Sequence, residues 1–240
     1  MLLITTPNFT GDVVVIANAA EALGWSVHRA TRGWRIPDWL KDQEGAVYGE
    51  QIFCEVVAAQ MNWTLAQNDK AWLANLDREH TGRQILFTNV RLARTMQSPK
   101  FISPADYRSF AGAIYKSGRY LPPSVVIDDE PVLVSDVVNF DSEYRTFIKD
   151  RSVVAASCYV YNGRPAEKAN WYYNTPLVIR YVNNLLSDEK IECVPGSVID
   201  VGMFANGKMA VVKTKPAWKS AIHGCDYAAA LDVIKDSVIN

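Results

Sequence analysis

Two apolar strands joined by an Asn-Gly turn near the C-terminus constrain the fold of this chain more than any other feature of its sequence. The first strand covers residues 197–202 and the second residues 209–218, with Asn206-Gly207 between them. An Asn-Gly pair between apolar runs is the strongest short-range signal of a β-hairpin, because both residues accept the backbone angles of a tight turn. The sequence therefore predicts an antiparallel hairpin here.

The hairpin carries ionisable side chains in an otherwise apolar setting, with Asp200 on the first strand and Lys213 and Lys215 on the second. Residues two apart on a strand face the same way, so the two lysines share a face, and Asp200 can lie opposite them across the ladder. Charges are costly to bury unless they are paired, so this pattern indicates a polyanion site or a metal site. Spacing alone leaves open the alternative that this face is simply solvated.

Composition excludes several classes of protein. The chain has 240 residues, of which 49% are hydrophobic and 21% charged, which is enough apolar sequence for a sizeable core. The formal net charge is -1 and the basic residues are scattered, so we expect no nucleic-acid partner. No stretch approaches the ~20 consecutive apolar residues of a membrane span, and the N-terminus lacks the basic region of a signal peptide. We therefore expect a soluble, cytoplasmic protein with no membrane partner.

The chain also lacks the common catalytic and nucleotide-binding motifs. Its cysteines and histidines do not have zinc-ligand spacing, and we interpret His223 as a structural residue. There is no G-x-S-x-G elbow, no P-loop and no G-x-G-x-x-G fingerprint, so any nucleotide must be bound in another way. The cysteines are Cys54, Cys158, Cys193 and Cys225, and the histidines are His28, His80 and His223.

The order of expected elements divides the chain into an α/β part and a β-rich part. Short apolar runs alternate with helical patterns up to about residue 96, which is typical of a parallel α/β unit. The expected strands there are residues 2–4, 25–29 and 46–48, and the expected helices are residues 12–23, 51–61, 72–76 and 85–96. From residue 100 the strands expected are 100–102, 124–127, 132–135, 144–148 and 153–161, with helices at 176–186 and 226–239.

The β-rich part resembles the ATP-grasp fold, and the whole chain resembles the clade of small ATP-grasp proteins named for one arginine and two lysines. Residues 100–106 (KFISPAD) are similar to the strand and turn where the family often has Phe-Val-Lys-Pro-Ala-Asp. Residues 132–136 resemble the segment that links the two lobes around adenine, and residues 141–148 resemble the Glu-Tyr-Arg strand of the clade. The hairpin resembles the C-terminal nucleotide and metal strands.

The resemblance implies an α+β protein. Residues 97–240 would form an ATP-grasp domain, with two β-rich lobes around a nucleotide cleft, and residues 1–96 an α/β pre-ATP-grasp domain. It also implies an ATP-dependent ligase that joins a carboxylate to an amine or a thiol through an acyl-phosphate. The expected partners are ATP, Mg²⁺, and small-molecule or peptide carboxylates and amines, and a homodimer is left open.

The resemblance assigns roles to individual residues. Arg145, Lys213 and Lys215 would neutralise the transferred phosphoryl group, and Asp200 would anchor Mg²⁺. Arg145 has an alternative role as the partner of Glu143 on the same strand. Backbone groups at residues 133–135 would read adenine, and Asp136 would accept hydrogen bonds from ribose. The complete expected nucleotide set is Lys100, Arg108, Leu133, Val134, Ser135, Asp136 and Glu143.

Two departures from the family pattern matter for the chemistry. Lys213 and Lys215 stand where ATP-grasp enzymes commonly have a Glu and an Asn that hold Mg²⁺, and lysine cations cannot ligate this metal. We therefore expect an altered ligand set. Either Asp200, waters and phosphates hold the metal, or the two lysines take over part of its charge, and the name of the clade favours the second alternative. Ser103 also replaces a frequent phosphate-contacting lysine. These changes keep a second reading open, a non-catalytic nucleotide-binding or protein-interaction module, and a third, an unrelated α+β protein with a solvated hairpin.

Overall fold

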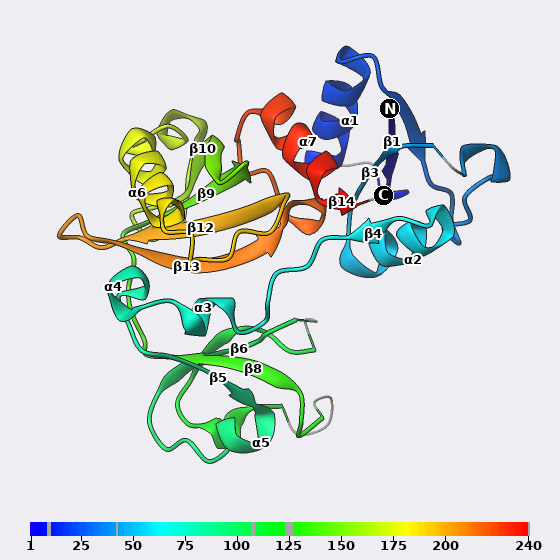
Figure 1. Cartoon of the computed structure of the whole chain (residues 1–240). Helices are drawn as coiled ribbons and strands as arrows, with labels where there is room; N and C mark the ends of the chain where they lie inside the picture. The colour runs from blue at the N-terminus through cyan, green and yellow to red at the C-terminus, as the bar shows by residue number, and fades with distance from the viewer. Residues whose placement is uncertain (9–10, 42, 107–108, 123–126, 240) are drawn as a thin grey trace. The chain divides into compact units, whose positions relative to one another are not determined.

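The structure is a computed structural model that describes residues 1–8, 11–41, 43–106, 109–122 and 127–239 (Figure 1). The chain divides into two compact units, each built from several chain segments. Unit 1 comprises residues 1–68, 141–201 and 213–240, and unit 2 comprises residues 69–140 and 202–212. No helix of the described residues is long and apolar enough to cross a membrane.

The N-terminal part of unit 1 is a parallel three-stranded sheet with helices. Its order is β2-β1-β3, and the central strand β1 is buried along its whole length, which explains its continuous apolar sequence. The alternation predicted from the sequence is therefore confirmed. The elements are β1 (Leu2–Thr5), α1 (Asp12–Ala22), β2 (Ser26–Arg29), η1 (Asp38–Leu40), β3 (Gly45–Tyr48) and α2 (Gln51–Met61).

A five-stranded sheet in the order β11-β10-β9-β12-β13 contains the predicted hairpin. Its strands are β9 (Ser142–Lys149), β10 (Ser152–Tyr161), β11 (Arg164–Pro165), β12 (Ser197–Met203) and β13 (Met209–Pro216). In the hairpin turn, the Asn206 side chain accepts a hydrogen bond from the backbone N–H of Lys208 at 3.1 Å. Gly207 has a φ of 79°, a left-handed angle that glycine adopts without strain.

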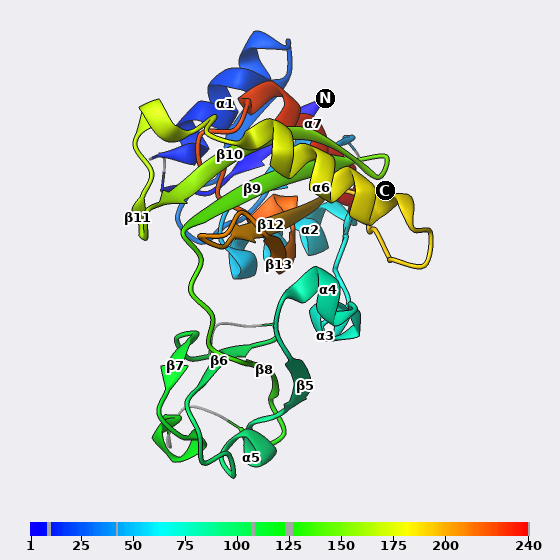
Figure 2. The same cartoon turned by 90° about the vertical axis from the view of Figure 1, so that its left-hand side faces the viewer.

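Helices cover this sheet and join it to the N-terminal segment. The helix α6 (Thr175–Ser187) packs on β10 and β9, as Figure 2 shows. The helix α7 (Tyr227–Asp236) packs against β9, β10, β3 and α1. One apolar core results, and it includes Leu3 and Phe53 from the N-terminal segment together with Phe147 and Trp218. Two short 3-10 helices complete this region, η3 (Lys168–Asn170) and η4 (Ala217–Lys219).

Unit 2 contains an antiparallel four-stranded sheet in the order β5-β8-β6-β7. One face packs on a small core that includes Val90, Ile102 and Val134. Cross-strand neighbours share a face, so Phe87, Phe101 and Ile114 lie on the other side, where each is exposed. The elements are α3 (Trp72–Asn75), α4 (Arg78–Thr81), β5 (Ile85–Asn89), α5 (Val90–Ala93), β6 (Lys100–Pro104), β7 (Ala113–Tyr115), η2 (Gly118–Tyr120) and β8 (Pro131–Ser135).

Two of the expected helices differ from the structure. Residues 85–96 do not form one helix, because β5 pairs with β8 and the Asn89 side chain caps α5 by accepting from Leu92 N–H. The C-terminal helix ends at Asp236, and β14 (Val238–Ile239) follows and pairs with β4 (Thr64–Leu65). The strand expected at 124–127 lies mostly outside the described residues.

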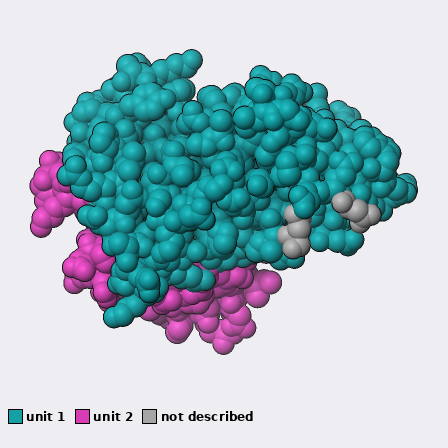
Figure 3. All heavy atoms as spheres, turned by 45° about the horizontal axis from the view of Figure 1, so that its top comes forward, with its two compact units in different colours: residues 1–68, 141–201, 213–240 teal, residues 69–140, 202–212 magenta. Residues whose placement is uncertain are grey.

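The N-terminal α/β segment does not stand as a pre-ATP-grasp domain of its own within the described residues. Residues 1–68 share a unit and a core with residues 141–201 and 213–240, whereas residues 69–96 belong to unit 2 (Figure 3). The division of the sequence into domains 1–96 and 97–240 stays a prediction. The two compact units are defined by contacts in space, whereas these domains are continuous stretches of sequence.

Candidate functional site

The charged hairpin residue Asp200 contacts Arg145, the arginine expected to belong to the site, and Lys213. Arg145 on β9, Asp200 on β12 and Lys213 on β13 come from three neighbouring strands. The Arg145 guanidinium donates from Nε to Asp200 Oδ1 at 2.9 Å and from an Nη to Oδ2 at 2.8 Å. The Lys213 ammonium lies 3.2 Å from the same Oδ2. The three residues, the charge cluster from here on, form a two-cation, one-anion arrangement in which Arg145 and Asp200 are buried.

Burial and charge fix the ionisation of Asp200. Its side chain is 1% exposed, whereas that of Lys213 is 39% exposed. Burial alone would raise the pKa of Asp200, but the charges of Arg145 and Lys213, with a smaller contribution from Lys215, hold this pKa well below its usual range. The hairpin face at Asp200 is therefore buried and ion-paired rather than simply solvated.

Arg145 is held on further sides by the protein. It donates to the backbone carbonyl of Ala221 at 2.5 Å, and its guanidinium lies 5.7 Å from the centre of the Tyr159 ring. Glu143 is not its partner, because the Glu143 carboxylate accepts a hydrogen bond from the Tyr159 hydroxyl at 2.5 Å. The alternative pairing of Arg145 with Glu143 is thus replaced by the bidentate pair with Asp200.

The loop between η4 and α7 adjoins the cluster. Residues 220–223 are each fixed by a contact from a different element: Tyr48 donates to Ser220 O at 3.0 Å, Arg145 to Ala221 O, Ile222 N–H to an Asp12 carboxylate oxygen at 2.8 Å, and Ser157 to His223 O at 2.6 Å. The His223 ring stacks on Tyr159 with 4.7 Å between ring centres. All these partners are distant in sequence, so no local signal predicts them.

The expected nucleotide residues of unit 2 form a second group. Lys100 and Asp136 are paired at 2.7 Å, and the other Asp136 oxygen accepts from Gln84 N–H at 3.2 Å. Leu133 and Val134 lie on β8, which is paired with β5 on one side and β6 on the other. Their backbone groups are therefore engaged in the sheet. Ser135 ends the same strand, and Arg108 lies outside the described residues.

The residues around Asp200 do not fit a conventional Mg²⁺ site. This metal demands several oxygen ligands in near-octahedral geometry. Both Asp200 oxygens already accept from Arg145, and the Lys213 ammonium lies against one of them. Among the described residues, no group of three or more His, Cys, Asp or Glu side chains is placed to hold a metal ion.

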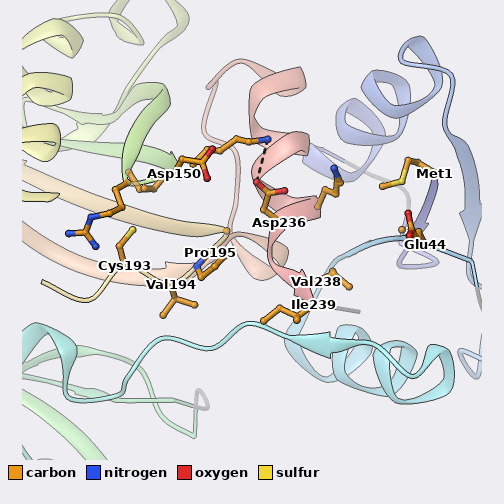
Figure 4. A pocket seen from close by; sticks show the side chains of 15 residues that line it. Met1, Glu44, Asp150, Cys193, Val194, Pro195, Asp236, Val238 and Ile239 are labelled. Atoms are coloured by element: carbon orange, nitrogen blue, oxygen red, sulfur yellow. Dashed lines mark ion pairs between the residues drawn. The ribbon is translucent and has the colours of Figure 1, made fainter. Parts of the chain in front are cut away.

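A pocket of about 590 Å³ in unit 1 is separate from the charge cluster and shares none of its residues. Figure 4 shows its lining, where Lys149 is paired with Asp236 at 3.4 Å beside Asp150. Lys149 also contacts Asp232 at 2.5 Å. This mixture of paired charges does not select one kind of ligand.

Comparison with known proteins agrees with the geometry. A family model described as an ATP-grasp domain, family 2 of the clade named for one arginine and two lysines, matches residues 80–233, and the chain belongs to this family. A search of curated protein sequences found no match.

Solved structures with low sequence identity share the fold. D-cycloserine synthetase DcsG is 14% identical over 98% of this chain and 99% of its own, with a TM-score of 0.59. The RimK domain protein ATP-grasp from Sphaerobacter thermophilus is 12% identical over 100% of both chains, with a TM-score of 0.53. The ATP-grasp ligase PsnB, solved with minimal precursor, Mg and ADP, is 13% identical over 98% of this chain and 96% of its own, with a TM-score of 0.50. The fold is therefore the ATP-grasp fold.

Proposed function

We propose that this protein is an ATP-dependent ligase that joins a carboxylate to an amine, or to a thiol, through an acyl-phosphate intermediate. Membership of the ATP-grasp family supports it, as do the synthetase and ligase among the structural neighbours. The observation that carries the proposal is the charge cluster, in which a buried Asp200 holds two cations and leaves one of them, Lys213, partly exposed.

The three members of the cluster have different tasks in this proposal. Lys213 is the cation that reaches solvent, so its ammonium contacts the transferred phosphoryl group and stabilises its charge. Lys215, two residues along the same strand, adds a second cation. Preorganised charges of this kind usually make the greatest single contribution to catalysis of phosphoryl and acyl transfer. Arg145 is 3% exposed and its guanidinium is bonded to Asp200, so Arg145 and Asp200 position Lys213 rather than contact ATP.

The nucleotide base would bind at unit 2 through side chains. The backbone of Leu133 and Val134 is engaged in the β-ladders on both sides of β8, which supports contacts to the base from side chains in this proposal. The face of this sheet that carries Phe87 and Phe101 is apolar and exposed, which suits a flat base. Lys100 and Asp136 stand at one end of the same sheet, and Asp136 would exchange its bond with Lys100 for ribose hydroxyls.

A second candidate function is a nucleotide-binding module without catalysis. The observation in its favour is the poor fit of Asp200 to a metal, because many phosphoryl transfers depend on bound Mg²⁺. Such a module would bind ATP but would release no ADP with any carboxylate and amine.

The deciding experiment measures ADP and phosphate release with ATP and a panel of amino acids and small carboxylates, each with an amine acceptor. Substrate-dependent release supports the ligase and identifies the substrate. Lys213→Met should abolish this release. Lys41→Met is the matched control, because Lys41 also pairs with an aspartate and its side chain is 42% exposed, close to the 39% of Lys213. ATP binding without release in every mixture would favour the binding module.

A further inference from the structure

The imidazole of His223 combines three properties that a purely structural histidine seldom shows together. Its backbone has a φ of 52°, in the left-handed region that costs a residue with a side chain free energy. Its ring is half-buried and stacked on Tyr159. Its ring nitrogens have no hydrogen-bond partner in the part of the chain that the structure describes, although the backbone carbonyl of the same residue accepts from Ser157.

The surroundings hold this imidazole in one place. The loop before it is fixed through Ser220, Ala221 and Ile222. After it, Gly224 has a φ of 78°, and a Cβ at Gly224 would lie only 2.4 Å from the Trp171 ring. The neighbouring residues are thus held by the protein, the backbone is strained and the ring nitrogens have no partner among the described residues. We expect this combination where a side chain is presented to a ligand.

The charge state of the ring decides which ligand suits it. Burial, together with the positive charge of Arg145, lowers the pKa of His223 to about 4, so the ring is neutral near pH 7. A neutral imidazole has one nitrogen that accepts a hydrogen bond and one N–H that donates. It adds no charge that would attract phosphate, and the cations of the charge cluster already serve that purpose.

Near the cluster, the imidazole is an acceptor that no described protein group uses, whereas the carboxylates are at least partly engaged. Both Asp200 oxygens are bonded to Arg145, and Glu143 and Asp12 each use one oxygen within the protein. An amine that attacks an acyl-phosphate must present its lone pair to the carbonyl carbon and direct an N–H elsewhere. A neutral imidazole nitrogen can accept that N–H.

We propose that His223 contacts the acceptor amine and orients it, with Tyr159 as the surface that holds the ring. The proposal rests on the ligase function and adds the residue that selects an amine as the second substrate. It makes His223 a substrate contact, and Tyr159 and Ser157 positioning residues.

The test uses the full-length protein, ATP, the twenty common amino acids as carboxylate donors and hydroxylamine as the amine probe, with hydroxamate and ADP as products. His223→Asn retains a residue that tolerates the left-handed backbone and removes the imidazole. The KM for hydroxylamine should rise about tenfold, the size expected for one lost hydrogen bond, while ATP affinity by calorimetry stays within about twofold. His28→Asn, on β2, is the matched control and should change neither quantity.

Chemical rescue separates a contact from a structural role. His223→Gly also suits a φ of 52°, and added imidazole should restore its hydroxamate formation, which a loss of folding would not allow. An unchanged KM for hydroxylamine in His223→Asn, or a fall in ATP affinity equal to the loss of activity, would overturn the proposal for His223 alone. If the wild type forms no hydroxamate and no ADP with any donor, the ligase function itself fails, and this inference fails with it.

Discussion

At the scale of single residues, Asp200 determines the chemistry of the cluster by what it is bonded to. Its buried carboxylate has two cationic neighbours, the bidentate Arg145 and Lys213, so the cluster has one more positive charge than negative. Three of the roughly four acceptor positions of this carboxylate are used by the two cations, which leaves little room for a hard metal ion and keeps the ammonium of Lys213 in a defined position. An acidic residue expected from the family to be a ligand can therefore serve as a counter-ion instead.

The first prediction concerns that counter-ion. Asp200→Asn removes the charge but keeps the shape, which leaves the nearly buried Arg145 without its partner. Losing one member of a buried pair should lower the free energy of unfolding by about 3 kcal/mol or more. Urea denaturation measures this. Asp129→Asn is the control, because the exposed pair of Asp129 with Arg91 should contribute about 1 kcal/mol or less. Equal stability of Asp200→Asn and the wild type would contradict the counter-ion role.

The second prediction follows from the lowered pKa of His223. In the folded protein this pKa is about 4, whereas in the unfolded chain it is close to 6.5. Between these values the unfolded state binds more protons, so this residue's contribution to stability is complete above about pH 6.5 and is lost as the pH falls towards 4. Denaturation at a series of pH values should show a smaller loss in His223→Asn than in the wild type. If the free energy of unfolding of both proteins changed with pH in the same way, the His223 ring would not be buried in its neutral form.

The residues that could be predicted are those whose signal is local. Asp200, Lys213 and Lys215 stand out because a charge in an apolar hairpin is anomalous, and their spacing gives the shared face. The pairing of Tyr159 with His223 could not be found in the same way. Their stacking joins segments more than sixty residues apart, and neither has an unusual sequence around it.

At the scale of elements, the sequence predicts the secondary structure of a segment well where its local pattern and its tertiary contacts favour the same structure. The hairpin and α1 form as expected because turn residues and apolar spacing define them. Residues 85–96 do not, since Ile85, Leu86 and Phe87 fit both a helix and a strand, and pairing with β8 decides between the two. Arg83 is buried, and its guanidinium donates to the carbonyls of Thr81 and Val211, which no local pattern predicts.

The third prediction belongs to the start of α7. The Asp226 carboxylate accepts from Ala229 N–H at 2.9 Å and caps the helix that packs on β9 and β3. Asp226→Ala should lower the free energy of unfolding by about 1 kcal/mol, because the N–H loses its partner. Asp77→Ala is a matched control, since Asp77 precedes α4 without a side-chain cap bond. Chemical denaturation of both variants gives the comparison, and equal losses would argue against a capping role for Asp226.

At the scale of the whole molecule, the composition of the two units could not be predicted from the sequence. The change from alternating strands and helices to mainly strands near residue 97 suggests one domain boundary. The chain, however, passes between the two units several times. The core of unit 1 depends on contacts of α7 with β3 and α1, which join the two ends of the sequence. Such long-range packing leaves no periodic pattern in either segment.

The last prediction concerns the metal dependence of the whole protein. If the cations of Lys213 and Lys215 supply fixed positive charge, and Asp200 is already neutralised, ATP should still bind when EDTA removes divalent metals, although more weakly. Calorimetry with EDTA and with Mg²⁺ measures both affinities. In the double variant Lys213→Glu, Lys215→Asn, the new carboxylate lies beside Asp200 and repels the triphosphate, so binding should be lost in EDTA and return with Mg²⁺. Lys41→Glu should behave as the wild type in both conditions. No binding of ATP to the wild type in EDTA would show that the lysines do not replace the metal's charge.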